Sequence, residues 1–363
     1  MLTHTLARVG LFSCFFLLLT AESSPSAQDD QVHLRMNVVL VQLTVAVTDS
    51  KGRYITGLRP EDFSVFEDKR PQKISTFEEN SESAPNSMEI ARPNRSRSAR
   101  NSGEAPATEL AKPEGNSADI TIAHSTDANV FVLFDTSNYM YRSFAYAQDA
   151  IIEFVRSMDE SSKVAFYSYS RNLSRATTLT SDHFRVVNGV RSTVAGDDAA
   201  LYNSLLMTIK DAAPLKGRKA IVVFSNGPDN ASSVPPEDVA ELAQSTGTII
   251  YILSTRHAQE DPVSAAAFER MSKVSGGKAY FARDWREEKQ AFASIRDDLV
   301  HLYTLSYYPK LNPNRGWRSI NVKLVGKDLQ KYNIRTRDGY RLMPASAGSV
   351  IDEPEFTSDA QPN

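Results

Sequence analysis

The first regular pattern along the chain is an alternation over residues 38–48, which is clearest from residue 41 onward. One face of this stretch is aliphatic and consists of Val39, Val41, Leu43, Val45 and Val47. A period of two predicts a half-buried strand. Two more short strands are predicted at residues 63–66 and 73–77, separated by a turn at residues 67–69. Three short strands cannot bury a core alone, so this segment needs more sheet from elsewhere in the chain.

A different pattern begins at residue 129, where buried strands alternate with amphipathic helices. Residues 130–134 are a continuous apolar run, and the apolar positions of residues 144–158 recur at helical spacing. Further strands are predicted at residues 163–169, 220–224, 248–253 and 278–282, an antiparallel partner at residues 175–180, and helices at residues 198–211, 236–244, 264–274 and 286–301. Such alternation predicts an α/β fold with a doubly wound, mainly parallel sheet that helices cover on both faces.

The C-terminal part returns to strand patterns, at residues 302–308, 320–324 and 332–336. These strands need a partner sheet, and so do the N-terminal ones. We therefore expect one small β-sandwich made of both flanks, with the α/β domain inserted between them. The expected division is a sandwich of residues 32–78 and 302–342, a flexible Ser/Pro/Asn-rich linker of residues 79–127 with a short edge strand at residues 120–122, an α/β domain of residues 128–301, and a disordered tail of residues 343–363.

The first 27 residues are typical of a secretory signal peptide. Arg8 precedes an apolar segment, residues 9–20, that is too short to span a bilayer, and small residues follow it up to Ala27. We expect a secreted or periplasmic protein that is not stably inserted in a membrane after cleavage. Cys14 is the only cysteine and would leave with the signal, which excludes disulfides and a thiol nucleophile. The net charge of −3 gives no reason to expect nucleic acid as a partner.

Three polar loops follow predicted strands or precede a helix at one edge of the sheet. They read Asp135-Thr136-Ser137-Asn138-Tyr139, then Gly196-Asp197-Asp198-Ala199-Ala200-Leu201-Tyr202, then Phe224-Ser225-Asn226-Gly227-Pro228-Asp229. In order and spacing they resemble the loops of von Willebrand factor type A domains, which read Asp-x-Ser-x-Ser, Gly-x-Thr-Ala-Leu-Tyr and Asp-Gly-x-Asp. The flanks resemble exported bacterial proteins described as type A-related, known largely from Acidobacteria, through Gly57-Leu58-Arg59-Pro60-Glu61-Asp62-Phe63 and Arg337-Asp338-Gly339-Tyr340.

The resemblance implies a metal-ion-dependent adhesion site for a hard cation, Mg²⁺ or Ca²⁺, which oxygen ligands would hold. Asp135 and Ser137 match two of the family's ligands. The other three positions are changed, since Tyr139 replaces a serine, Ala199 a threonine and Asn226 an aspartate. The loss of one charge and two hydroxyls is expected to weaken metal binding. Three nearby carboxylates are possible substitute ligands: Asp197, Asp198 and Asp229.

The family resemblance and the missing ligands together predict a non-catalytic module, without a cofactor, that binds an unidentified protein partner. The expected binding face consists of Asp135, Ser137, Tyr139, Asp198 and Asn226. Tyr141 is expected beside Tyr139, since exposed aromatic side chains favour protein contacts. A purely structural role is the alternative: Asp135 and Ser137 would then satisfy backbone N–H groups of a turn, and the two tyrosines would be partly buried under a loop.

Two other functions remain open at this point. One is an adhesion module that does depend on Mg²⁺ or Ca²⁺. The other is a hydrolase with an unrecognised site, although the sequence has no His-x-x-x-His zinc pair, no Gly-x-Ser-x-Gly motif, and no Gly-x-Gly-x-x-Gly after the first α/β strand.

Overall fold

A computed structural model of the chain describes residues 40–79, 121–123, 128–255 and 260–342. The expected signal peptide, most of the expected linker and the expected tail lie outside these residues. The short strand expected at residues 120–122 is found as β5 (Thr121–Ala123) at an edge of its sheet.

The α/β part is built on a six-stranded sheet with the order β11-β10-β9-β6-β7-β8. All neighbouring strands are parallel except β7 and β8, which are antiparallel. The prediction of a doubly wound, mainly parallel sheet is therefore confirmed. Its strands are β6 (Ala128–Asp135), β7 (Lys163–Tyr169), β8 (Leu173–Thr180), β9 (Arg218–Phe224), β10 (Thr248–Thr255) and β11 (Ala279–Ala282).

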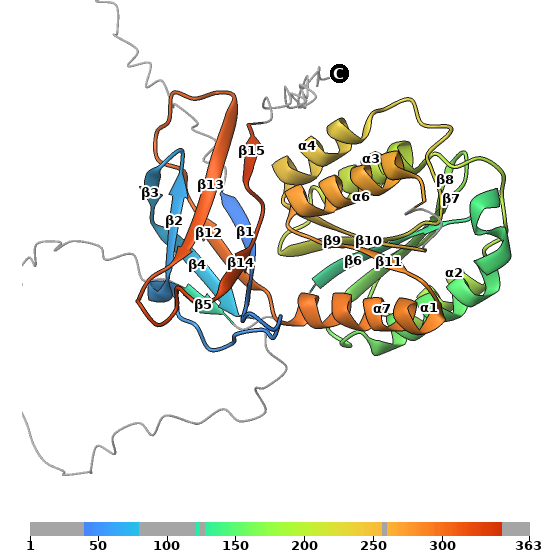
Figure 1. Ribbon diagram of the computed structural model, residues 1–363, viewed down its shortest axis with the longest axis horizontal. Coiled ribbons are helices and arrows are strands. Elements are labelled where there is room, and N and C mark those ends of the chain that lie inside the picture. Colours follow the sequence, from blue (N-terminus) through green and yellow to red (C-terminus); the bar gives the residue numbers. More distant parts are fainter. Residues whose placement is uncertain (1–39, 80–120, 124–127, 256–259, 343–363) are drawn as a thin grey trace, which may run out of the picture. The chain divides into compact units, whose positions relative to one another are not determined.

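Helices cover both faces of this sheet (Figure 1). One face carries α1 (Phe144–Ser157), α2 (His183–Arg191) and α7 (Trp285–Val300). The other carries α3 (Leu201–Ala212), α4 (Pro236–Thr246) and α6 (Pro262–Ser275). A short 3₁₀ helix, η2 (Asn138–Ser143), leads from β6 into α1. The sequence did not predict α2, and α3 begins at Leu201 rather than at residue 198, so Asp198 lies in a loop.

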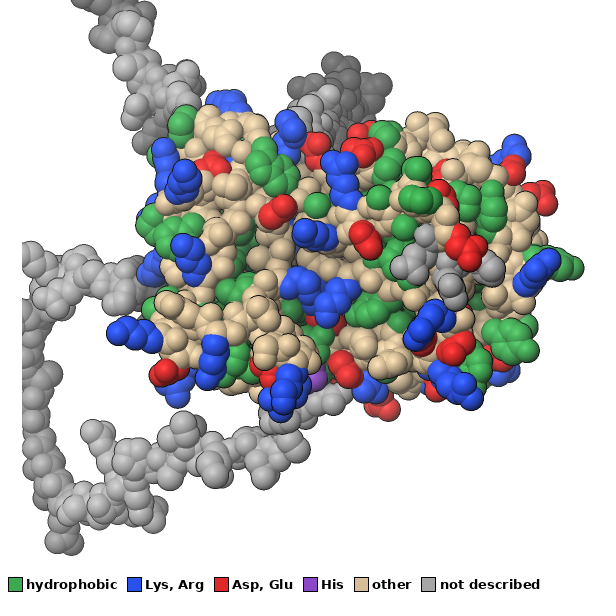
Figure 2. Space-filling model, in the orientation of Figure 1, with side chains coloured by type: hydrophobic (Ala, Val, Ile, Leu, Met, Phe, Trp, Pro, Cys, Tyr) green, Lys and Arg blue, Asp and Glu red, His purple; other side chains and the backbone are tan. Residues whose placement is uncertain are grey.

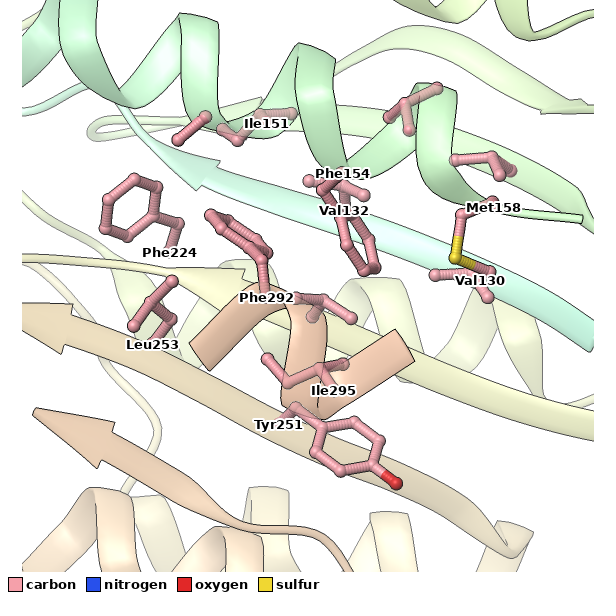
Figure 3. Close-up of a cluster of buried hydrophobic side chains, with 14 of the residues drawn as sticks. Val130, Val132, Ile151, Phe154, Met158, Phe224, Tyr251, Leu253, Phe292 and Ile295 are labelled. Atoms are coloured by element: carbon pink, nitrogen blue, oxygen red, sulfur yellow. The ribbon is translucent and has the colours of Figure 1, made fainter. Parts of the chain in front are cut away.

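The central strand β6 contributes to the core on both sides, because successive side chains of a strand point to opposite faces. Val130, Val132 and Phe134 pack against α1 and α7, while Phe131 and Leu133 pack against the opposite helices. Figure 3 shows the first cluster. Side chains of β6, β9 and β10 lie opposite side chains of the two helices, such as Phe154 of α1 and Phe292 of α7. Each large apolar side chain buried in this way stabilises the fold by about 1.5–3 kcal/mol.

The flanks form two antiparallel-rich sheets that share one core. The first has the order β14-β1-β12-β4-β5 and the second β15-β13-β2-β3. After a 3₁₀ turn, η1 (Pro60–Asp62), the chain enters β2. The remaining strands are β1 (Val41–Thr48), β2 (Phe63–Glu67), β3 (Arg70–Gln72), β4 (Ile74–Glu79), β12 (Tyr303–Tyr307), β13 (Trp317–Leu324), β14 (Asn333–Arg335) and β15 (Gly339–Arg341).

Both flanks of the chain contribute to each of these sheets, as predicted. The strand β12, which follows the α/β part, lies between β1 and β4, which precede it. In the second sheet β13 pairs with β2 in the same way. We propose that residues 128–301 are the α/β domain, and that residues 32–78 and 302–342 together make up the sandwich. Among the described residues, no helix is long and apolar enough to cross a membrane.

A buried carboxylate ties the two flanks together inside the sandwich. The side chain of Glu67 on β2 is fully buried and pairs with Arg318 of β13 at 3.0 Å. It also accepts hydrogen bonds from the hydroxyls of Tyr307, at 2.8 Å, and Tyr340, at 2.9 Å. A buried carboxylate with this many donors is well compensated, but removing its counter-charge leaves an isolated charge in the core.

We expect Arg318→Met to lower the free energy of unfolding by about 3–5 kcal/mol, because Glu67 would lose its charged partner. Equilibrium unfolding in urea measures this loss. Arg270→Met is the matched control: Arg270 pairs with Glu237 at 2.9 Å on the surface, so its loss should cost less than about 1 kcal/mol. Similar small losses in both variants would contradict the role given to Glu67.

Candidate functional site

The strand order reverses beside β6, which is where open α/β sheets place their ligand sites. From β6 the chain continues to β7 on one side, while β9, β10 and β11 extend the sheet on the other. Phe134 of β6 is in register with Phe224 of β9, and Asp135 is in register with Tyr169 of β7. The pairing therefore brings Asp135 and Ser225, the residue after Phe224, to the same edge of the sheet.

Asp135 is completely buried at this edge. Its Oδ1 accepts a hydrogen bond from the backbone N–H of Ser137 at 2.8 Å, a local turn that Asp commonly forms. Its Oδ2 accepts from the Ser225 hydroxyl at 2.7 Å. Both carboxylate oxygens thus have a partner inside the protein, and no ligand can reach them without moving the residues around them.

Backbone hydrogen bonds hold the loop after β6 to its neighbours. The N–H and the hydroxyl of Thr136 both donate to the carbonyl of Tyr169, at 2.7 and 2.8 Å. The Thr136 carbonyl accepts from the N–H of Gly196 at 2.7 Å, and the N–H of Asn138 donates to the carbonyl of Asp197 at 2.7 Å. The first two predicted loops therefore lie side by side in a fixed arrangement.

The position at which the family has a threonine ligand is occupied here by a core residue. Ala199 is 1% exposed and packs in the cluster under α3 and α4. Its N–H donates to Asn230 Oδ1 at 2.8 Å, and its carbonyl accepts from the N–H groups of Asn230 and Ala231 at 3.0 and 3.1 Å. Ala199 joins the second predicted loop to the third but offers no oxygen from its side chain.

The three carboxylates considered as substitute ligands have separate surroundings. Asp229 caps the start of α3: one oxygen accepts from the N–H of Tyr202 at 2.8 Å, and the other accepts from the N–H of Ser232 at 2.8 Å. Asp198 is partly exposed and forms an ion pair with Arg171. Asp197 is exposed. None of the three makes a hydrogen bond to Asp135 or Ser137 in the structure.

Asn226 replaces the family's second aspartate and is also largely buried, with 6% of its surface exposed. Its Oδ1 accepts a hydrogen bond from the N–H of Thr255, at the end of β10, at 3.1 Å. The side-chain oxygen of Asn226 therefore closes the loop after β9 onto the neighbouring strand.

Tyr139, at the position of the family's second serine, packs against the third loop. A Cβ atom added to Gly227 would lie 2.4 Å from Tyr139 Cγ and 2.8 Å from its Cδ2, so the ring rests directly on the glycine backbone. Tyr139 is 39% exposed, and Tyr141, two residues on, is 74% exposed, while Met140 between them is buried. One side of the Tyr139 ring thus seals the loop and the rest of it reaches the surface.

Two hydroxyls near Asp135, those of Ser137 and Tyr169, are buried and make no hydrogen bond of good geometry. Burial raises the pKa of the Asp135 carboxyl, and the hydrogen bonds from Ser137 and Ser225 offset only part of this effect. Burial, followed by the charge of Asp135, raises the pKa of Tyr169 well above its ordinary value. The cluster is therefore a buried, polar site with a single carboxylate.

This donor set does not fit a hard divalent cation as the residues stand. Such an ion takes six or more oxygen ligands, several of them anionic. Here there is one carboxylate, and both of its oxygens already accept hydrogen bonds. Over the parts of the chain that the structure describes, no group of three His, Cys, Asp or Glu side chains could hold a metal ion.

Exposed aromatic side chains surround the closed cluster. Besides Tyr139 and Tyr141, Tyr146 at the start of α1 is 71% exposed and Trp285 at the start of α7 is 54% exposed. Tyr146 and Trp285 line a cavity of about 470 Å³ together with Thr255 and the largely buried Glu288. This cavity lies beside Asn226, which accepts the hydrogen bond from Thr255.

Sequence reasoning missed three residues that shape the cluster: Thr136, Tyr169 and Ser225. Each is adjacent to a predicted strand end, and Ser225 directly precedes Asn226. A polar residue at the end of every central strand was therefore the available signal. The family pattern drew attention to the expected ligands and away from these neighbours.

One family model and several solved structures are similar to part of this chain. Residues 130–228 match the sequence model of the von Willebrand factor type A domain. The structure of BatB from Bacteroides thetaiotaomicron is 15% identical, with a TM-score of 0.40, and the match covers 47% of this chain and 98% of that one. A von Willebrand factor type A protein from Catenulispora acidiphila is 10% identical, with a TM-score of 0.41, over 59% of this chain and 67% of that one.

A third solved structure, proximal thread matrix protein 1 from the mussel byssus with a zinc-occupied MIDAS motif, is 15% identical, with a TM-score of 0.41 over 48% of each chain. No curated protein matches the sequence. The matched residues 130–228 include most of β6, all of β7 and β9, and nearly all of the three loops. Residues 130–228, within the α/β part of the chain, are thus similar to a von Willebrand factor type A domain.

Proposed function

We propose that this chain is an exported, non-catalytic protein-binding module that uses the loop face at the C-terminal ends of the parallel strands. Type A domains are mostly non-catalytic interaction modules, which supports this class of function. The proposed face is that of Asp135, Ser137, Tyr139, Asp198 and Asn226. Tyr139 and Asp198 are the members that a partner touches, and the three buried residues form the floor that holds the loops in place.

The closed state of the cluster is the observation that carries the proposal. Asp135 and Ser137 are fully buried, Asn226 Oδ1 accepts a backbone hydrogen bond, and the ring of Tyr139 rests on Gly227. A site whose carboxylate and amide oxygens already accept hydrogen bonds gains little from a cation, because the ion would have to displace these hydrogen bonds and give up its own hydration. We therefore infer that binding to the partner does not need a metal.

The exposed aromatic residues are the second support. Tyrosine and tryptophan are enriched where protein interfaces are strongest. Tyr141, Tyr146 and Trp285 are each more than half exposed at the same edge of the sheet. Figure 2 shows lysine and arginine side chains spread over the visible face, with acidic side chains among them. This mixed charge, with a net charge of −3, favours a protein partner over nucleic acid.

The metal-dependent alternative has one observation in its favour. The hydroxyls of Ser137 and Tyr169 are buried without a hydrogen-bond partner, and their oxygen atoms could coordinate a cation beside Asp135. The hydrolase alternative has less support, because the only carboxylate of the cluster is inaccessible. A phosphatase and esterase screen that finds turnover in the wild type, lost in Asp135→Asn, would replace the binding proposal by the hydrolase.

We predict that the wild-type protein shows no binding of Mg²⁺, Ca²⁺ or Mn²⁺ by isothermal titration calorimetry at millimolar concentrations. The double variant Tyr139→Ser with Asn226→Asp should gain binding with a Kd on the order of 10⁻³ M or tighter, because it restores a hydroxyl and a carboxylate. Adding Ala199→Thr should strengthen binding if the core accepts the larger side chain. Heat in the wild type that disappears in Asp135→Asn would show that the site is metal-dependent after all.

We predict that Tyr141→Ala and Trp285→Ala each weaken binding of the partner by roughly 30-fold, the effect of losing a central aromatic contact worth about 2 kcal/mol. The immobilised protein would capture partners from an envelope extract of the organism that makes it. Mass spectrometry would then compare the amount of each captured protein between the wild type and the variants. Phe184→Ala and Leu311→Ala remove equally exposed apolar side chains, 74% and 88% exposed, away from this edge. The proposed face would be contradicted if the control variants captured as little of the partner as Tyr141→Ala and Trp285→Ala do.

A further inference from the structure

A cavity of about 530 Å³ lies at the opposite edge of the α/β sheet, beside the N-terminal ends of β9 and β10. It is lined by the start of β1, the loop before β9, the end of α4 and the residues around β15. Four of its lining residues are cationic, namely Lys216, Lys219, Arg337 and Arg341, and none is Asp or Glu. The balance of charge in this cavity is therefore strongly positive, unlike that of the whole chain.

Lys219 is the innermost of the two lysines, with only 8% of its surface exposed. Its ammonium group makes one hydrogen bond, to the carbonyl of Ala213, at a long distance of 3.4 Å. An ammonium has three donors, so most of its hydrogen-bonding capacity is unused. Burial and the nearby charge of Arg337 lower the pKa of Lys219 to about 8.

Arg337 is the second buried cation, with 6% of its surface exposed. Its guanidinium donates to the carbonyl of Gln244 and, at 2.7 Å, to the carbonyl of Gln42. These carbonyls hold the group in place but carry no charge. The buried Nε–H has no partner, and no acidic side chain of the described residues pairs with Arg337.

Two buried cations without a counter-charge lower the stability of the fold. They lose their hydration on burial, and no ion pair compensates for that loss. The acidic groups nearby are already engaged. Glu241 pairs with Arg341 at 2.5 Å, where both side chains are about half exposed, and Asp338 accepts a hydrogen bond from Gln244 at 2.9 Å. The hydroxyl of Ser245, on the wall of the same cavity, is buried without a partner.

We propose that this cavity binds an oxyanion, the phosphate or carboxylate group of a small molecule, between Lys219 and Arg337. Such a group would accept hydrogen bonds from the free donors of Lys219. It would also accept from Nε–H of Arg337 and from the Ser245 hydroxyl once the side chains that cover these two buried atoms shift. The volume lies within the range of small-molecule sites, so the ligand extends beyond its anionic group. Leu40, Leu215 and Tyr340 give that remainder an apolar wall. The site is separate from the proposed protein-binding face and does not depend on it.

The same chemistry has two possible sources. One is a free small molecule. The other is the chain itself, because Asp352, Glu353 and Glu355 follow soon after Leu342, which lines the cavity. Replacing these three carboxylates by amides distinguishes the two sources. The affinity for added phosphate should stay unchanged if the natural ligand is a free molecule, and should rise if the carboxylates occupy the cavity.

The test uses the full chain with inorganic phosphate as the probe, against chloride at equal ionic strength, and measures Tm and the heat of binding. Phosphate should raise the Tm of the wild type. Lys219→Met should weaken phosphate binding by at least about tenfold, the effect of losing a charge-assisted hydrogen bond. Without phosphate the same variant should have a higher Tm than the wild type, because it removes an uncompensated buried charge.

Three further variants make the outcome decisive. Lys216→Met removes an exposed lysine of the same cavity and should keep most of the phosphate response. Ser245→Ala, a change too small to endanger folding, should weaken binding severalfold. The full-length variant Asp352→Asn, Glu353→Gln, Glu355→Gln should bind phosphate as the wild type does if the natural ligand is free, and more tightly if these carboxylates occupy the cavity.

Two results would overturn the proposal. One is that neither the wild type nor the triple amide variant responds to phosphate more than to chloride, while Lys219→Met lowers the Tm as an ordinary core substitution would. The other is a phosphate response that Lys219→Met and Ser245→Ala both leave intact, because the ion would then bind elsewhere on the surface.

Discussion

The parallel pairing of β6 with both of its neighbours is the constraint on which the α/β part depends. Because β6 is central, its side chains feed the cores on both faces, and its register with β7 and β9 decides which residues meet where the three strands end. A shift of one residue would turn Val132 and Leu133 to the wrong faces. The same register puts Asp135 within hydrogen-bonding distance of Ser225. One strand register therefore determines both the packing of the core and the geometry of the loop cluster.

Buried charges are compensated differently at the two ends of the parallel strands. At one edge a single carboxylate, Asp135, is surrounded by hydroxyl and N–H donors, and the aromatic ring of Tyr139 closes the loops over Gly227. At the other edge two cations, Lys219 and Arg337, are buried with carbonyl acceptors but no anion. In the first arrangement both oxygens of the buried carboxylate accept hydrogen bonds. In the second the buried cations have no acidic partner among the described residues, and carbonyl dipoles offset only part of the cost of burying a cation.

The sequence was sufficient for features that depend on local periodicity. Strand and helix alternation over residues 130–301 predicted the doubly wound sheet, and Asp135 was correctly expected at a strand end. The helix α2 was missed because it has only nine residues and most of its buried positions are valines, which favour strands. Its signal was Asp182, whose side chain accepts from the N–H of Arg185 as a cap.

The state of the candidate site could not be predicted, because it depends on distant partners: Ser225 is 90 residues from Asp135, and the contact of Tyr139 with Gly227 follows from the fold of three loops. The roles given to the site residues remain predictions.

The place of β12 in the sandwich has a consequence for the order in which the protein can assemble. This strand pairs Leu305 with Leu43 on one side and with Phe77 on the other, yet it is synthesised only after the whole α/β part. At ordinary rates of translation the N-terminal strands wait on the order of ten seconds or more for it, and during that time their open edges can pair with other chains. The strands that follow the α/β part are therefore needed to complete the sheets that the N-terminal strands begin. A chain cut short before Tyr303 would keep β1 and β4 unpaired on the sides that β12 covers, and such exposed edges are what proteases and chaperones recognise as unfinished protein.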